Sequence, residues 1–291
     1  MEEIHEIISR YDEDYISRSL QSLEDINKFT GTFVKDVTEI YDCITRLRNI
    51  DRNPTGFSLE DAPILGLLTR MWKLLKEIVV YYESNNAEII SILERPLIEA
   101  SITAQFLLIN DSKVMEDYRK CSYKDRLRIL RELKGGSHFF DTKAGKRLLK
   151  SVEEKMELEG LTVDDFKEQK QNRWRLQGKT FFDIFKEFEG EDLYKYTYGM
   201  MSESIHGSWN ESMDWCLSKN DDDTFNVYPF YHEADVRYIC PTLKLCNAPY
   251  RLWLQRIDCE DEYLSDVLDW IERVNTRIFM IFDKKYDGPN G

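Results

Sequence analysis

Apolar positions in the first fifth of the chain recur at the spacing of an α-helix. From Phe33 onward they are separated by four, three, four and three residues, which is the spacing of a helical seam. The pattern predicts a long amphipathic helix over 26–47, ended by the turn at 51–56. Two arrangements are open for this seam: it packs against the chain's own helices, or it joins two copies in a homodimer. The seam residues are Phe33, Val37, Ile40, Ile44 and Leu47.

Similar signals continue to the C-terminus. The segment 87–109 is apolar nearly all the way round, which indicates a helix at the centre of a bundle, with Pro96 inside it. No stretch shows the period-two alternation of a strand. We therefore predict an all-α protein, a single bundle of nine or ten helices over 1–291. The other expected helices cover 61–82, 111–134, 141–160, a short turn from 162, 180–188, 192–205, 242–257 and 262–283, and an exposed loop covers 220–235.

Composition narrows the class of protein. Forty Lys and Arg against 54 Asp and Glu give a net charge of −14, which disfavours a general coat for nucleic acid. The N-terminal residues have neither a basic nor an apolar signal region, and the two most apolar windows contain charges, so we expect a cytoplasmic protein without a membrane partner. The six cysteines are scattered without zinc-ligand spacing, so we expect mostly buried thiols, no metal and no cofactor.

One segment departs from the acidic balance. Between Arg119 and Lys150 there are eleven Lys or Arg against three acids. We favour a structural interpretation, in which this basic segment forms a solvated helix face or pairs with the acidic run 258–272. The alternative is a contact for RNA or phosphate. The candidate nucleic-acid contacts are Arg126, Arg128, Arg131, Lys146 and Arg147.

Charged residues on the central helix are the first candidates for chemistry. Arg95 and Glu99 lie four residues apart on one face of a helix that is otherwise apolar. Arg preceding Glu is the poorer order for a surface pair, so we expect a partner from elsewhere in the fold. The pair is either a buried structural salt bridge or half of a polar site.

A second group of polar residues follows the expected helix 192–205. Tyr194, Tyr198, Ser202 and His206 are four residues apart and predict one stripe of hydroxyls ending in an imidazole. Gly207 follows His206, so the histidine is either an acid–base or hydrogen-bonding group or only the last residue before a left-handed glycine cap.

These residues carry a family resemblance. The segments ILERPLIEASITAQFLL (92–108) and RWRLQGKTFFDIFKEFEGEDLYKYTYGMMSESIHGSW (173–209) resemble an uncharacterised family of bacterial all-helical proteins. Its pattern is Arg-x-x-x-Glu, then a Trp, here Trp174, then Tyr-x-x-x-Tyr-x-x-x-Ser-x-x-x-His-Gly-Ser. The resemblance implies a bundle in which the two motif helices meet, with a family-like core at 82–215 and a C-terminal helical extension at 216–291. It supplies no activity.

A more distant similarity is to HEPN-type helical proteins, many of which are ribonucleases with an Arg four to six residues before a His. Here Met200, Met201 and Ser202 occupy that stretch, so the Arg is missing.

Two functions follow from these patterns. The favoured one is a non-catalytic sensor or interaction module in bacterial stress or phage defence, with a homodimer or another protein as candidate partner. In that case Arg95, Glu99, Tyr198, Ser202 and His206 form a buried network that fixes helix packing or holds a small ligand. Tyr194 and Trp174 are further candidates for this network or ligand site. The alternative is a metal-independent ribonuclease acting on RNA. In that case His206 is the general acid or base, Ser202 or Tyr198 orients the phosphate, and Arg95, paired with Glu99, stabilises the transition state.

Overall fold

The computed structural model describes residues 2–166 and 174–286, without the side chains of 124–126, and it is all-α apart from one small hairpin. The predicted fold class is confirmed, with more helices than the nine or ten expected. Contacts divide the chain into two compact units, 1–110 together with 184–291, and 111–183. The chain leaves the first unit after residue 110 and returns at 184, and each unit has its own core. Among the described helices, none is long and apolar enough to cross a bilayer.

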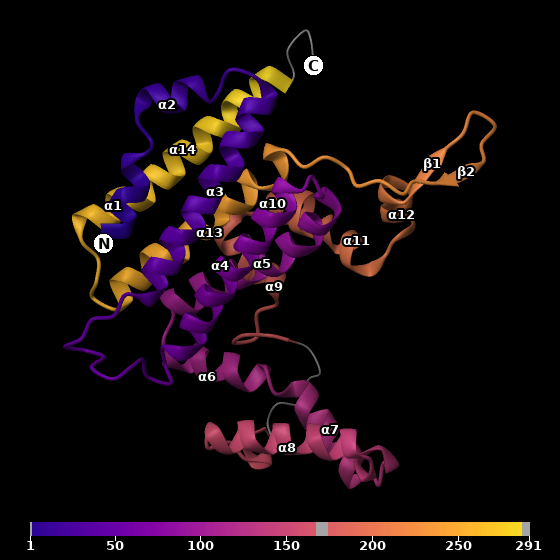
Figure 1. Cartoon of the computed structure of the whole chain (residues 1–291). Coiled ribbons are helices and arrows are strands. Elements are labelled where there is room, and N and C mark those ends of the chain that lie inside the picture. The colour runs from indigo at the N-terminus through magenta and orange to yellow at the C-terminus, as the bar shows by residue number, and fades with distance from the viewer. Residues whose placement is uncertain (1, 167–173, 287–291) are drawn as a thin grey trace. The chain divides into compact units, whose positions relative to one another are not determined.

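The first unit is a bundle of long helices (Figure 1). Its largest buried side chains include Trp253 and the rings of Tyr41 and Tyr250, which stack with centroids 4.0 Å apart. These aromatic rings fill the space where the helices cross. The helices are α1 (Glu2–Ser9), α2 (Glu13–Arg18), α3 (Leu23–Arg46), α4 (Ala62–Glu83), α5 (Ala87–Ile109), α13 (Cys240–Arg256) and α14 (Glu262–Tyr286).

The predicted seam lies inside this bundle. Phe33, Val37, Ile40 and Ile44 of α3 are fully buried, and α3 packs against α4, α13 and α14. Of the two arrangements that the sequence left open, the structure therefore has the intramolecular one.

Helix α5 is at the centre, as its apolar composition predicts. It packs against α4 and α13, and Pro96 lies within it. The two C-terminal helices belong to the same bundle, because α13 contacts α5 and α14 contacts α13 and α3.

The second unit is a small helical assembly with its own core. The helix expected over 111–134 is interrupted at Ser122 and Tyr123, where Tyr123 turns inward to join that core. The core side chains are Tyr123, Leu127, Val152, Met156 and Phe166. The elements are α6 (Ser112–Cys121), α7 (Lys124–Lys134), the 3-10 turn η1 (His138–Asp141), α8 (Lys143–Leu158) and the 3-10 turn η2 (Val163–Phe166).

The chain between the second unit and α13 is made of short elements. The sequence predicts no strands, but β1 and β2 pair antiparallel, with Ser218 opposite Asn226. Strands of three residues are too short to show an alternation in the sequence. The elements are α9 (Phe181–Glu189), α10 (Glu191–Leu193), the π-helical turn η3 (Tyr194–Gly199), α11 (Met201–His206), α12 (Trp209–Trp215), β1 (Leu217–Lys219), β2 (Phe225–Val227) and the 3-10 turn η4 (Val236–Tyr238).

Candidate functional site

Four of the predicted site residues meet where α11 packs against α5. The Arg95 guanidinium donates through Nε to Glu99 Oε1 at 3.3 Å and through Nη1 to Ser202 Oγ. The Tyr198 hydroxyl donates to the same Glu99 oxygen, and the Arg95 guanidinium lies 4.6 Å from the centre of the Tyr198 ring. The tertiary partner expected for the Arg95 pair therefore comes from η3 and α11. We call these four residues the Arg95 cluster.

The Arg95 cluster is only partly open to solvent. The side chain of Arg95 is 18% exposed and that of Glu99 45%, while Tyr198 is buried. Burial, followed by the hydrogen bond to Glu99, raises the pKa of Tyr198 above its ordinary value. The phenol therefore stays protonated and donates, and the cation, the carboxylate and the two hydroxyls satisfy one another.

A π-helical turn positions Tyr198. The sequence predicts one α-helix over 192–205, whereas residues 194–199 form wider i→i+5 turns between α10 and α11. Tyr194 is the first residue of this turn, and the centroid of its ring lies 5.4 Å from that of Phe185 and 5.1 Å from that of Tyr198. Tyr198 and Ser202 reach Arg95, so the predicted stripe is divided between an aromatic contact and a hydrogen-bonded cluster.

His206 and Trp174 lie outside the Arg95 cluster. His206 ends α11 in front of Gly207, which has the left-handed φ of 59° expected of a glycine cap. The imidazole is exposed and makes no hydrogen bond or ion pair within the described residues. Trp174 belongs to the second unit, where its ring contacts Phe181 with centroids 6.5 Å apart.

The predicted nucleic-acid contacts have different surroundings. Arg128 approaches Glu132 at 3.8 Å on α7. Arg131, Lys146 and Arg147 are exposed. The side chain of Arg126 lies outside the described part of the chain.

A buried carboxyl group was missing from the predicted site. Glu94, next to Arg95 on α5, is buried and accepts a 2.6 Å hydrogen bond from Thr242 Oγ1 of α13. Burial raises its pKa to about 8. The signal in the sequence was a third charge on an apolar helix, but the sequence does not indicate which of the three faces the interior.

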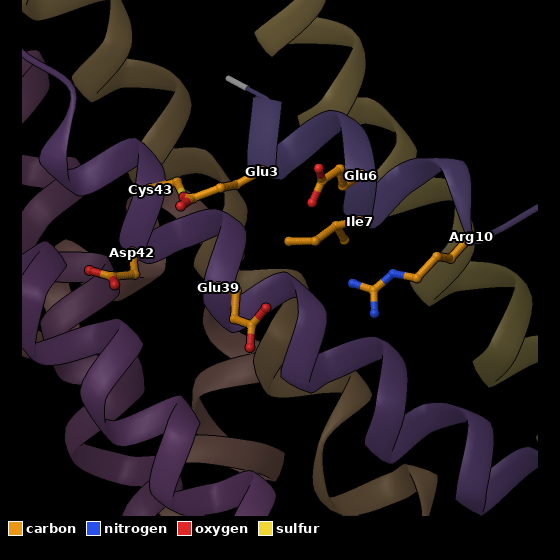
Figure 2. Close-up of a pocket in the computed structure, with 7 residues that line it drawn as sticks. All are labelled: Glu3, Glu6, Ile7, Arg10, Glu39, Asp42 and Cys43. Carbon is orange, nitrogen blue, oxygen red and sulfur yellow. The ribbon is translucent and has the colours of Figure 1, made fainter.

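A groove of about 560 Å³ lies between α1 and α3. Figure 2 shows its carboxylates together with Arg10 and Cys43. The Cys43 thiol donates to Glu3 Oε2 at 3.3 Å, and burial raises its pKa to about 11. The excess of carboxylates disfavours an anionic ligand here. Within the described residues, no group of His, Cys, Asp and Glu is arranged to hold a metal ion. The groove is lined by Glu3, Glu6, Ile7, Arg10, Glu39, Asp42 and Cys43.

The Arg95 cluster lies within the part of the chain that matches a known protein family. Residues 61–225, more than half of the chain, match a family described as "Family of unknown function (DUF5677)". The chain belongs to this family. The DUF5677 match contains α4, α5, the whole second unit and the Arg95 cluster, and it ends at the first residue of β2. No curated protein and no solved structure matches the chain significantly. Membership of DUF5677 therefore supports the resemblance to an uncharacterised family and assigns no activity.

Proposed function

We propose that this DUF5677 protein is a non-catalytic interaction module and that residues 199–233, which we call the arm, bind a second copy of the chain. The setting implied by the resemblance, bacterial stress or phage defence, is part of the proposal. The Arg95 cluster then has a structural role, since it fastens α11, the first helix of the arm, to the central helix α5.

The proposal rests on one observation: the arm is folded, yet none of its residues is buried. It contains α11, α12 and the hairpin, which extends from the bundle (Figure 1). A lone two-stranded hairpin is marginally stable in water, and a group of exposed apolar side chains is typical of an interaction surface. The large apolar side chains exposed on the arm are Met200, Ile205, Trp209, Phe225, Val227, Phe230 and Tyr231.

The outer edge of β2 suits a second copy. Among the described residues, no strand lies beside that edge, and the strand carries no charge. The β1 strand, by contrast, carries Lys219, a residue that protects edges against pairing. Antiparallel pairing of two β2 strands about a two-fold axis places Phe225 of one copy opposite Val227 of the other. It also keeps the acidic hairpin tips, at 221–223, at opposite ends of the joint sheet.

Val227→Lys is therefore expected to convert a dimer into a monomer. Val227 is 76% exposed, so the change costs little folding free energy, but it places a charge on the pairing edge. The measurement is sedimentation velocity or light scattering over a range of concentrations. Tyr196→Lys is the matched control, because Tyr196 is 74% exposed and lies outside the arm. A monomeric wild type, or a dimer unaffected by Val227→Lys, contradicts pairing through β2.

The competing function, a metal-independent ribonuclease, is tested separately. The hydrogen bonds of Arg95 go to Glu99 and Ser202, and His206 takes no part in the Arg95 cluster. We expect no cleavage of total RNA by the wild type or by His206→Ala in low salt with chelator. Cleavage is measured by gel electrophoresis. Cleavage of RNA by the wild type but not by His206→Ala would contradict the non-catalytic proposal.

A further inference from the structure

We propose that the second unit binds single-stranded nucleic acid at the end where α7, η1 and α8 meet, which we call the basic turn. This inference is independent of the arm. The chemistry recognised is a phosphodiester backbone together with an unstacked base, which RNA and DNA both provide.

Charge is strongly segregated between the two units. The second unit has 18 Lys and Arg against 14 Asp and Glu, whereas the rest of the chain has 22 against 40. A polyanion is therefore repelled by the first unit and attracted by the second. The net charge of −14 for the whole chain therefore does not exclude nucleic-acid binding by the second unit.

Five cations gather at the basic turn, and none of them forms an ion pair with another residue in the described part of the chain. They come from the last two turns of α7 and the first two turns of α8, and all are exposed. The two acids of this stretch are engaged elsewhere: Glu132 with Arg128, and Asp141 with His138 at 3.5 Å. The five are Arg131, Lys134, Lys143, Lys146 and Arg147.

The placement of three of these cations costs stability. The first five residues of α8 include Lys143, Lys146 and Arg147, and its first turn contains no acid. Cations near a helix N-terminus are unfavourable because that end of the helix carries partial positive charge. A bound phosphate chain would remove this repulsion.

An exposed aromatic ring completes the basic turn. Phe139 in η1 is 48% exposed, while its neighbour Phe140 is buried and anchors the turn. Gly145 allows η1 to pack closely on α8, because a Cβ atom there would lie 2.2 Å from the Phe139 carbonyl oxygen. Phe139 thus lies on the turn that joins the cations of α7 to those of α8, and a base can stack on its exposed ring while the nucleic-acid backbone contacts the cations.

Fluorescence anisotropy with labelled 20-nucleotide single strands of RNA and of DNA tests the proposal on the full chain. If all five cations contact phosphates, log K should fall with log salt with a slope of about −3.5, and removing three should leave about −1.4. We therefore expect Arg131→Ser, Lys146→Ser and Arg147→Ser together to weaken binding about tenfold or more. Comparing the two strands distinguishes RNA from DNA as the natural source.

A second variant tests stacking without changing charge. Phe139→Ala should weaken binding about tenfold at unchanged salt slope, because stacking on an aromatic ring contributes about this much per base. Its control is Leu158→Ala, at the other end of α8, where an apolar side chain is 84% exposed. Circular dichroism and thermal unfolding check that each variant is folded.

Matched controls define what would overturn the proposal. Arg18→Ser, Lys28→Ser and Lys284→Ser together remove three exposed cations from the first unit and should leave the affinity within about twofold. Equal losses in both triple variants would show only general charge attraction. No binding at low salt, or binding of polyglutamate but of neither nucleic acid, would also overturn it, the latter in favour of an acidic protein partner.

Discussion

Replacing Glu94 with glutamine should stabilise the protein, and the gain should increase with pH. The folded-state pKa of Glu94 is raised from 4.5 to about 8 by burial, so between these values the folded state holds a proton that the unfolded state has lost. The stability contributed by this proton is complete below pH 4.5 and is lost as pH rises through 8. The rate of loss is about 1.4 kcal/mol per pH unit. Glutamine keeps an oxygen that can accept from Thr242 and does not titrate.

Urea unfolding of the wild type and Glu94→Gln from pH 5 to 9 checks this. The difference in free energy of unfolding should be small at pH 5 and reach several kcal/mol at pH 9. Glu77→Gln on the exposed surface of α4 is the control and should differ from wild type by less than about 0.5 kcal/mol throughout. A constant difference between wild type and Glu94→Gln would mean that Glu94 is ionised in the fold, paired with a cation.

Arg95→Met is expected to lower the free energy of unfolding by about 2 kcal/mol. Methionine keeps an unbranched apolar stem, but it is shorter than arginine and cannot form the hydrogen bonds to Glu99 and Ser202 or stack a guanidinium on Tyr198. Glu99 is 45% exposed and recovers water, which limits the loss. Because the Arg95 cluster fastens α11 to α5, amide hydrogen exchange should also accelerate in residues 199–233.

The control for Arg95 is Arg46→Met on α3. Arg46 also pairs with a carboxylate four residues away, at 2.6 Å, but its side chain is 73% exposed. Surface pairs of this kind contribute about 0.3–0.5 kcal/mol. A double-mutant cycle between Arg95→Met and Ser202→Ala should give a coupling of about 1 kcal/mol. No coupling, together with an effect no larger than that of Arg46→Met, would remove the structural role of the cluster.

Periodicity predicts the long helices well and the short elements poorly. The helix at 87–109 has the same ends in the structure as in the prediction, since its apolar residues are continuous and Asn86 and Asn110 flank it. The helices α1, α2 and α12 and the strands β1 and β2 were missed. Each has eight residues or fewer, too few turns or alternations for a period to emerge, and tertiary context decides them.

The candidate site was predicted in part for a similar reason. Arg95, Glu99, Tyr198 and Ser202 meet because two helices with polar stripes pack together, which the spacing of four indicates. His206 was expected with them because the sequence reads as a regular α-helix throughout. Nothing in the sequence marks residues 194–199 as π-helical. Glu132 contacts Arg128 and Asp141 contacts His138, so within the described residues neither pairs with the five cations of the basic turn, and this too depends on geometry.

The wide turn at 194–199 also sets how far α11, which follows it, is rotated about the helix axis. A π-helical turn accommodates one more residue than an α-helical turn, so it behaves as an insertion within a continuous helix. Each residue of an α-helix advances by about 100° around the axis, so removing one residue here would rotate α11 by that angle. Ser202 would turn away from Arg95, and the direction in which the chain leaves at Gly207 would change with it. The orientation of the arm therefore depends on the number of residues in the turn 194–199 as much as on their chemistry.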